Sequence, residues 1–122
     1  MRVERELMRG AGPFAVLQLL RKREMYGYEL VDALSQRTDG VLAMGQSTLY
    51  PMLYNLQARG FITSRWRQAP SGRHRKYYAL STRGVQHLAV ETPQWQSLVN
   101  AIAALGVVAD RSGDQARTET PV

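Results

Sequence analysis

The sequence contains no cysteine among its 122 residues. Disulfides and thiolate metal sites are therefore excluded, and a chain of this kind is expected in a reducing cytoplasm. Long apolar runs are missing as well: the longest, Leu98 to Ala109, contains Asn100 and falls short of the ~20 residues that a membrane-spanning helix needs. The segment from Met1 to Glu6 is too charged for the apolar region of a signal peptide. These absences predict a cytoplasmic protein that has no membrane partner.

Catalytic and metal-binding signatures are also absent from the sequence. His74 and His87 are the only histidines, and neither has a histidine, cysteine or carboxylate at the spacing of metal ligands. The sequence has no glycine-rich phosphate loop, no nucleophile elbow and no Ser/His/Asp signature. We therefore expect no catalytic residue, no metal, no cofactor and no enzymatic activity.

Negative charge is missing from the middle of the chain. All ten Asp and Glu residues lie outside the stretch from Gly40 to Val90, whereas seven of the sixteen basic residues lie inside it. These seven are Arg59, Arg65, Arg67, Arg73, Arg75, Lys76 and Arg83. The net charge of +6 therefore comes from this one block. A field of one sign indicates an anionic partner.

Lysine is scarce, since only Lys22 and Lys76 accompany the arginines. Arginine favours planar, bidentate contacts with phosphate, but a GC-rich genome would produce the same bias. Both explanations stay open at this point.

Apolar periodicity predicts two helices in the first forty residues. The first has Pro13 in its opening turn and ends near Arg23. The second covers Tyr26 to Thr38 and is stopped by Asp39 and Gly40.

A third helix is predicted from Ser47 to Arg59, with Ser47 as its N-cap, Pro51 in its first turn and Gly60 at its end. Its apolar positions recur at helical spacing and form one face, made by Leu49, Met52, Leu53 and Leu56. The opposite face presents Thr48, Tyr50, Tyr54 and Asn55.

In the next two segments, side chains are expected to point alternately to the two faces, as they do in β-strands. Phe61 to Arg67 and His74 to Leu80 predict a hairpin around the turn Ala69 to Gly72. Alternation places Tyr77 and Tyr78 on opposite faces, so one of them is expected to pack inward. Ser81 is the expected cap of a last helix, which Pro93 either kinks or restarts.

The order of three helices, two strands and one helix predicts a mainly α (α+β) fold, a winged helix-turn-helix. We expect this DNA-binding domain to cover residues 1–84, with residues 1–12 as an N-terminal extension, and a disordered polar tail to cover residues 110–122. Residues 85–109 are expected to form a dimerisation helix, because apolar residues recur along it at heptad-like spacing and form a seam. The seam contains Leu88, Trp95, Leu98, Ile102 and Leu105. The alternative is that this helix folds back on its own domain, and whether residues 1–12 join the dimer contact is left open.

Four runs of sequence carry a family resemblance. They are Met25–Leu30, Ser47–Leu53, Leu56–Ile62 and Gly72–Ser81, which read MYGYEL, STLYPML, LQARGFI and GRHRKYYALS. With these runs in this order, the chain resembles the short-tailed branch of the PadR family of bacterial transcriptional regulators. The resemblance implies a homodimer built through the C-terminal helix, operator binding by the winged helix, and usually repression.

The same resemblance implies a ligand site. Some short-tailed members take planar aromatic or drug-like compounds between tryptophans at the dimer interface, and Trp95 stands at that position. Leu98 and Val99, on the next turn, are the expected neighbours of the ligand. Pro93 departs from the family pattern, in which this helix runs unbroken.

The predicted DNA contacts fall into three groups. At the start of the third helix, Ser47, Thr48 and Tyr50 are placed to touch phosphates or base edges, with Tyr54 and Asn55 further along. In the hairpin, Arg73 is expected near the minor groove and Arg75 or Lys76 on phosphate. The resemblance implies a backbone contact from the hydroxyl of Tyr26 or Tyr28, against the alternative that Tyr26, Gly27 and Tyr28 only shape a turn and fill the core.

These observations predict a dimeric repressor that binds a palindromic operator in double-stranded DNA and is released by an aromatic effector. One alternative is a DNA-binding regulator without a small-molecule ligand. Another is a basic module that binds RNA or an acidic protein, which would lack preference for one DNA sequence.

Overall fold

The computed structural model describes residues 1–106, which form four helices and three short strands. In chain order these are α1 (Arg5–Lys22), β1 (Met25–Tyr26), α2 (Gly27–Gln36), α3 (Gln46–Ala58), β2 (Ile62–Gln68), β3 (His74–Leu80) and α4 (Thr82–Ala104). This confirms the predicted winged helix-turn-helix, an α+β fold with few strands. The tail predicted to be disordered, residues 110–122, lies outside the described residues, as do the last three residues predicted for the final helix.

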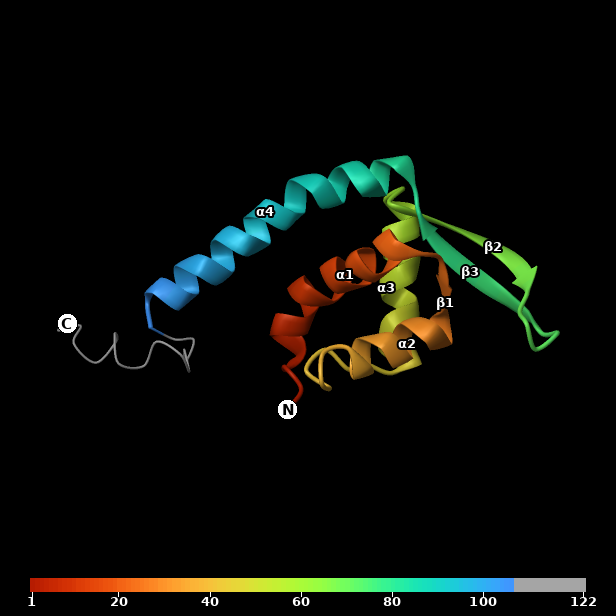
Figure 1. Cartoon of the computed structure of the whole chain (residues 1–122), viewed down its shortest axis with the longest axis horizontal. Helices are drawn as coiled ribbons and strands as arrows, with labels where there is room; N and C mark the ends of the chain where they lie inside the picture. The colour runs from red at the N-terminus through yellow and green to blue at the C-terminus, as the bar shows by residue number, and fades with distance from the viewer. Residues whose placement is uncertain (107–122) are drawn as a thin grey trace. The chain divides into compact units, whose positions relative to one another are not determined.

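The core lies where α1, α2 and α3 pack against one another and against the sheet. Each helix contributes side chains that are almost fully buried, among them Leu17, Leu30, Leu34, Leu49 and Leu53. Helical spacing brings these leucines onto one face of each helix, so the three faces meet. The hairpin of β2 and β3 extends away from this bundle (Figure 1).

The sheet has the order β1-β3-β2, and all its pairs are antiparallel. Strand β1 was not predicted, because two residues are too few to leave an alternating pattern. It pairs Met25 with Tyr78 and Tyr26 with Tyr77. Met25, Ile62 and Tyr78 belong to the core cluster, so their side of the sheet is its inner face.

Both Tyr77 and Tyr78 are buried, with 4% and 5% of their surface exposed, but only Tyr78 belongs to the core cluster, which agrees with the prediction that one of the two packs inward. Tyr78 enters the core as alternation requires. Tyr77 lies on the outer face, where the side chains of neighbouring residues cover it.

Two prolines lie deeper in their helices than predicted. α1 begins at Arg5, so Pro13 is inside the helix rather than in its first turn. The additional turns are held by Met8, which is buried in the core. α3 begins at Gln46 with Gly45 as its N-cap, so Pro51 lies in the second turn and Ser47 is not the cap. Each proline removes one helical hydrogen bond from the carbonyl four residues earlier. Because Ser47 and Pro51 are exposed, water can reach that carbonyl in α3.

The described residues divide into two compact units, residues 1–89 and residues 90–106. Helix α4 begins in the first unit, where the Gly84 N–H donates to Ser81 Oγ over 2.9 Å, and this confirms Ser81 as the cap. The helix includes Pro93 and does not restart there.

The first turn of α4 rests directly on Phe61. A Cβ atom at Gly84 would lie 2.0 Å from the Phe61 carbonyl oxygen, a backbone atom that cannot turn away. We therefore expect Gly84→Ala to destabilise the fold by about 2–3 kcal/mol, at the large end of single substitutions. Thermal and urea denaturation followed by circular dichroism measure this loss.

Gly10 provides the matched control. It lies inside α1, and a Cβ there would meet nothing within 4 Å. Gly10→Ala should therefore stabilise the protein by roughly 0.5–1 kcal/mol. Equal effects of the two substitutions would contradict the close approach at Gly84.

Candidate nucleic-acid interface

The outward face of α3 carries the polar and aromatic residues that the sequence predicted. Its buried face, formed by Leu49, Leu53 and Leu56, is fixed in the core. Ser47, Thr48, Tyr50, Tyr54 and Asn55 are exposed on the remaining surface. Tyr50 has 43% of its surface exposed and Tyr54 has 75%. Two exposed tyrosines on one helix offer hydroxyl groups and aromatic rings to any molecule that contacts α3.

Tyr50 also connects α3 to the start of α2. A Cβ at Gly27 would lie 2.3 Å from the Tyr50 hydroxyl, so the absence of a side chain at Gly27 makes room for this ring. Burial, with a smaller electrostatic contribution from Tyr50, raises the pKa of Tyr78 above its ordinary value. The close approach of the Tyr50 ring to Gly27 therefore helps to position the predicted contact residue Tyr50.

The start of α2 places Tyr26 and Tyr28 differently. The Tyr26 N–H donates to Glu29 Oε1 over 3.1 Å, which satisfies one of the free donors at the helix start. The Tyr26 ring meets Tyr77 edge-on, with 5.4 Å between ring centroids. The Tyr28 ring is 62% exposed. Of these two tyrosines, only Tyr28 presents most of its side chain to the surface.

We call the hairpin of β2 and β3 the wing. Its register places Trp66 opposite Lys76, and both side chains are exposed. Arg73 is exposed at the turn, next to Gly72, which has a positive φ of 92°. Ser64 Oγ donates to Gln57 Oε1 over 3.2 Å and ties the base of the wing to α3. Since alternation puts Trp66 and Lys76 on the same strand face as Ser64, they lie on the side of the wing from which this hydrogen bond to α3 is made.

The outer face of the sheet holds a different arrangement, which we call the outer cluster: Glu24, Tyr26, Arg65, Arg67, Arg75 and Tyr77. Glu24 Oε2 accepts from Arg65 Nη2 over 3.1 Å and from Arg67 Nη1 over 2.6 Å. The Arg67 guanidinium lies 3.9 Å from the Tyr77 ring centroid, and that of Arg75 lies 4.3 Å from the Tyr26 ring centroid. Cation–π stacking of this kind is what covers Tyr77.

The outer cluster changes the expected role of Arg75. Its Nε–H is buried and has no hydrogen-bond acceptor among the described residues. The guanidinium is already stacked on Tyr26, so Arg75 is used within the chain. Of the three basic residues predicted to contact DNA from the wing, Arg73 and Lys76 are exposed.

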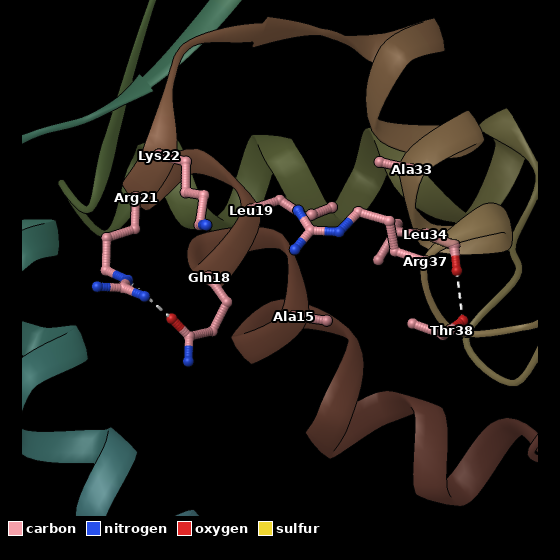
Figure 2. A pocket seen from close by; sticks show the side chains of 9 residues that line it. All are labelled: Ala15, Gln18, Leu19, Arg21, Lys22, Ala33, Leu34, Arg37 and Thr38. Carbon is pink, nitrogen blue, oxygen red and sulfur yellow. Dashed lines mark hydrogen bonds between the residues drawn. The ribbon is translucent and has the colours of Figure 1, made fainter.

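A separate hollow of about 280 Å³ lies between α1 and α2 (Figure 2). Three bases, Arg21, Lys22 and Arg37, line it together with Gln18 and small or apolar residues. Arg21 Nε donates to Gln18 Oε1 over 3.2 Å. None of the predicted contact residues lies in this hollow.

The described residues contain no group of three or more His, Asp or Glu placed to hold a metal ion. No helix in residues 1–106 combines the length and the apolar character needed to cross a bilayer.

An exposed helix beside a basic wing is the arrangement expected of a winged-helix DNA-binding domain, and the sequence was compared with known families. The model of the transcriptional regulator PadR-like family matches residues 16–90, more than half of the chain. The chain belongs to this family. As a PadR-like transcriptional regulator it is not an enzyme, in agreement with the expectation from the sequence.

Three relatives illustrate the similarity. The PadR-like chain is 33% identical over 75 residues to the negative transcriptional regulator PadR of Bacillus subtilis (strain 168), covering 62% of this chain and 41% of that protein. A crystal structure of a PadR family transcriptional regulator from Eggerthella lenta is 32% identical, with a TM-score of 0.69, over 85% of this chain and 88% of the other. A crystal structure of Bacillus subtilis PadR in complex with operator DNA is 31% identical, with a TM-score of 0.59, over 66% of this chain and 45% of the other. The PadR-like chain thus spans less than half the length of the two Bacillus subtilis matches.

Helix α4 of the PadR-like chain separates the residues predicted for its seam. Leu88 lies in the core of the first unit with 2% exposure, so it is used within this chain and not by a second one. Beyond Val90, the exposed apolar side chains include Leu98, Val99, Ile102 and Leu105. Trp95 is partly buried, and its Nε1–H donates to Glu91 Oε2 over 3.1 Å. The seam predicted from spacing therefore contains one residue buried in the first unit, Leu88, and exposed residues beyond Val90.

Two residues of the sheet region, Glu24 and Trp66, were missed by the sequence analysis. Glu24 gave no signal, because its partners Arg65 and Arg67 lie far along the chain and only the strand register brings them together. Trp66 has 67% of its surface exposed. Its place opposite Lys76 follows from the alternation of the predicted hairpin, so the sequence did contain the information for this residue.

Glu24 balances two arginines at once, and its removal should affect stability. We expect Glu24→Gln to destabilise the fold by about 0.5–1 kcal/mol at low salt, because Arg65 and Arg67 lose their counter-charge on a partly buried face. The loss should shrink at 1 M salt, where the Debye length is about 3 Å. Urea denaturation at both salt concentrations measures it.

Glu6→Gln is the control, since Glu6 makes a single 3.6 Å pair with Arg9 between exposed side chains. We expect it to be nearly neutral. If Glu24→Gln is equally neutral, the outer cluster does not hold the sheet together.

Proposed function

We propose that the protein is a homodimeric repressor whose α3 reads a palindromic operator and whose wing holds the adjoining backbone. The observation that carries this proposal is the exposed face of α3, with Tyr50 and Tyr54, next to a basic wing in a PadR-like chain. An α-helix fits the major groove of B-DNA. The Bacillus subtilis PadR with 31% identity was crystallised with operator DNA, which supports the same target for this chain.

Within α3, Ser47, Thr48 and Tyr50 contact the backbone and base edges at the start of the helix. Tyr54 and Asn55 lie one turn further and reach the same groove. Tyr28, whose ring is largely exposed, contributes a hydroxyl to a phosphate from the start of α2. Tyr26 has the supporting role of carrying the Arg75 guanidinium on its ring.

In the wing, Arg73 and Lys76 bind the duplex directly. Arg73 lies at the turn and points toward the minor groove, and Lys76 binds a phosphate. Trp66, exposed opposite Lys76, adds an apolar surface for deoxyribose. Arg75 supports this surface from the outer face of the sheet.

Dimerisation uses the part of α4 beyond Val90. Leu98, Ile102 and Leu105 are exposed there at spacings of four and three residues, which is the pattern of a helix seam that packs against a second copy. Two copies related by a two-fold axis place their recognition helices roughly 34 Å apart, in successive major grooves. The operator is therefore a palindrome.

A planar aromatic effector binds at this dimer interface, against Trp95, Leu98 and Val99. Stacking on an indole ring suits a flat apolar compound. A ligand shifts an equilibrium only through different affinities for the two states, so the DNA-bound and released dimers differ at this site.

Operator binding is tested by gel shift on DNA from the promoter region of the protein's own gene, with a salt series and excess random duplex. We expect a complex of dimer stoichiometry that prefers its operator over random duplex by about 10³-fold or more. Arg73→Gln with Lys76→Gln should lower the slope of log affinity against log salt by about 0.9, since Lys76 neutralises one phosphate and each neutralised phosphate contributes about 0.9.

Arg21→Gln with Lys22→Gln removes the same charge at the hollow between α1 and α2 and should leave that slope nearly unchanged. A complex that random duplex abolishes would indicate a basic module without sequence preference and would refute the proposal.

Effector binding is tested by fluorescence in Trp66→Phe, which leaves Trp95 as the only tryptophan. We expect planar aromatic compounds to quench Trp95 and to weaken the operator complex over the same concentration range. Quenching should disappear in Leu98→Asp, which introduces a charge beside the ring. If none of the planar aromatic compounds tested quenches Trp95, the effector site is refuted, and the alternative of a DNA-binding regulator without a small-molecule ligand is favoured.

A further inference from the structure

The N-terminal segment approaches the start of α3. Arg2, Arg5 and Arg9, which we call the N-terminal arginines, line a hollow of about 460 Å³ together with Thr48. Met8, Met44 and Met52 also line this hollow. Three bases far from the basic block in sequence are thus placed beside a residue proposed to contact DNA.

Interactions within the first unit hold the N-terminal segment in this place. The Val3 N–H donates to the Val41 carbonyl oxygen over 3.0 Å, at the connection that leads into α3. The Val3 side chain packs against the core, and Met8 is buried in it. The arginines therefore start from an anchored backbone and project from it.

The charges of this group are only partly balanced. Arg9 pairs with Glu6 over 3.6 Å, and both side chains are largely exposed, so the pair contributes little. Glu4 is the only acidic residue that lines the hollow. Arg2 and Arg5 make no ion pair within residues 1–106. In the wing, by contrast, Glu24 occupies both Arg65 and Arg67.

The position of the hollow relative to α3 decides what the arginines can bind. On the helix, Tyr50 and Gln57 flank one side of the exposed face, and Thr48 and Asn55 flank the other. Gln57 bonds to Ser64 of the wing, and Thr48 lines the hollow. The wing and the N-terminal arginines therefore lie on opposite flanks of α3. A helix in a major groove has a phosphate backbone along each flank.

We infer that Arg2, Arg5 and Arg9 form a second phosphate-binding site, which holds the backbone on the side of the groove opposite the wing. This inference rests on the proposed operator binding by α3. The ligand is the sugar-phosphate backbone of duplex DNA, recognised by charge and by bidentate guanidinium contacts. The site adds affinity and fixes the register of α3 and carries no base preference of its own.

The test compares two triple variants with the same loss of charge. Arg2→Gln/Arg5→Gln/Arg9→Gln removes the N-terminal arginines. Arg21→Gln/Lys22→Gln/Arg37→Gln removes three bases from the hollow in Figure 2, which contains no proposed DNA contact. Affinity for the operator is measured over a salt series for both variants and the wild type, with circular dichroism to confirm folding and light scattering to measure mass.

We expect the N-terminal variant to lower the salt slope by up to about 2.7, or about 0.9 for each arginine that binds a phosphate, and to weaken binding to operator and random duplex alike. The control variant should change the slope much less. Equal effects of the two variants would show that only long-range charge matters and would overturn the inference. A change of dimer mass at an unaltered slope would overturn it too, because the segment would then serve the dimer.

The two proposals fail in different ways. If the wild type does not prefer its operator over random duplex, the proposed function is wrong and this inference falls with it. If the wild type prefers its operator and the N-terminal variant binds with an unchanged slope, only the inference is wrong.

Discussion

The burial of one face of α3 determines what the rest of the molecule can present. Leu49, Leu53 and Leu56 lie in the core between α1, α2 and the sheet, and this fixes the rotation of the helix about its axis. A helix rotated by one residue would turn an apolar side chain outward and a tyrosine inward, at a cost of roughly 1.5–3 kcal/mol for each leucine exposed. The outward set of Thr48, Tyr50 and Tyr54 is therefore a consequence of packing. Gly27 leaves room for the Tyr50 ring in the orientation that it has in this structure.

Arginine serves two purposes in the same hairpin. On the outer face, Arg67 and Arg75 stack on tyrosine rings, and Glu24 balances Arg65 and Arg67. These side chains cover the outer face of the sheet. At the turn and on the inner face, Arg73 and Lys76 remain exposed. Counting positive residues in the sequence therefore overestimates how many are available to an anionic partner.

The sequence predicted the elements of this fold well and their connections less well. Helical spacing located α2 and α3, and alternation located β2 and β3, because each pattern is repeated within its own segment. Strand β1 and the ion pairs of Glu24 were missed, because they depend on residues about forty to fifty positions apart. Pro13 and Pro51 were placed in first turns on the assumption that helices avoid interior proline. In both helices the burial of apolar residues on the first turns outweighs the one hydrogen bond that each proline removes. Most of the predicted contact residues are on the surface, and Leu88 is the clear exception, since a heptad count cannot distinguish a core residue from an interface residue.

Phe61 joins three elements at one point. Its N–H donates to the Leu56 carbonyl oxygen at the end of α3, and its carbonyl oxygen accepts from the Ser81 N–H at the start of α4. Its ring stacks on His87 of α4 with 4.1 Å between centroids, and the guanidinium of Arg59, just beyond α3, lies over it. Gly84 packs closely against the same carbonyl group, so there is no space between the first turn of α4 and Phe61 for a side chain. The end of α3, the start of the wing and the beginning of α4 therefore all contact one residue, Phe61. A displacement of the first turn of α4 would therefore act on the end of α3 and on the start of the wing through the same residue.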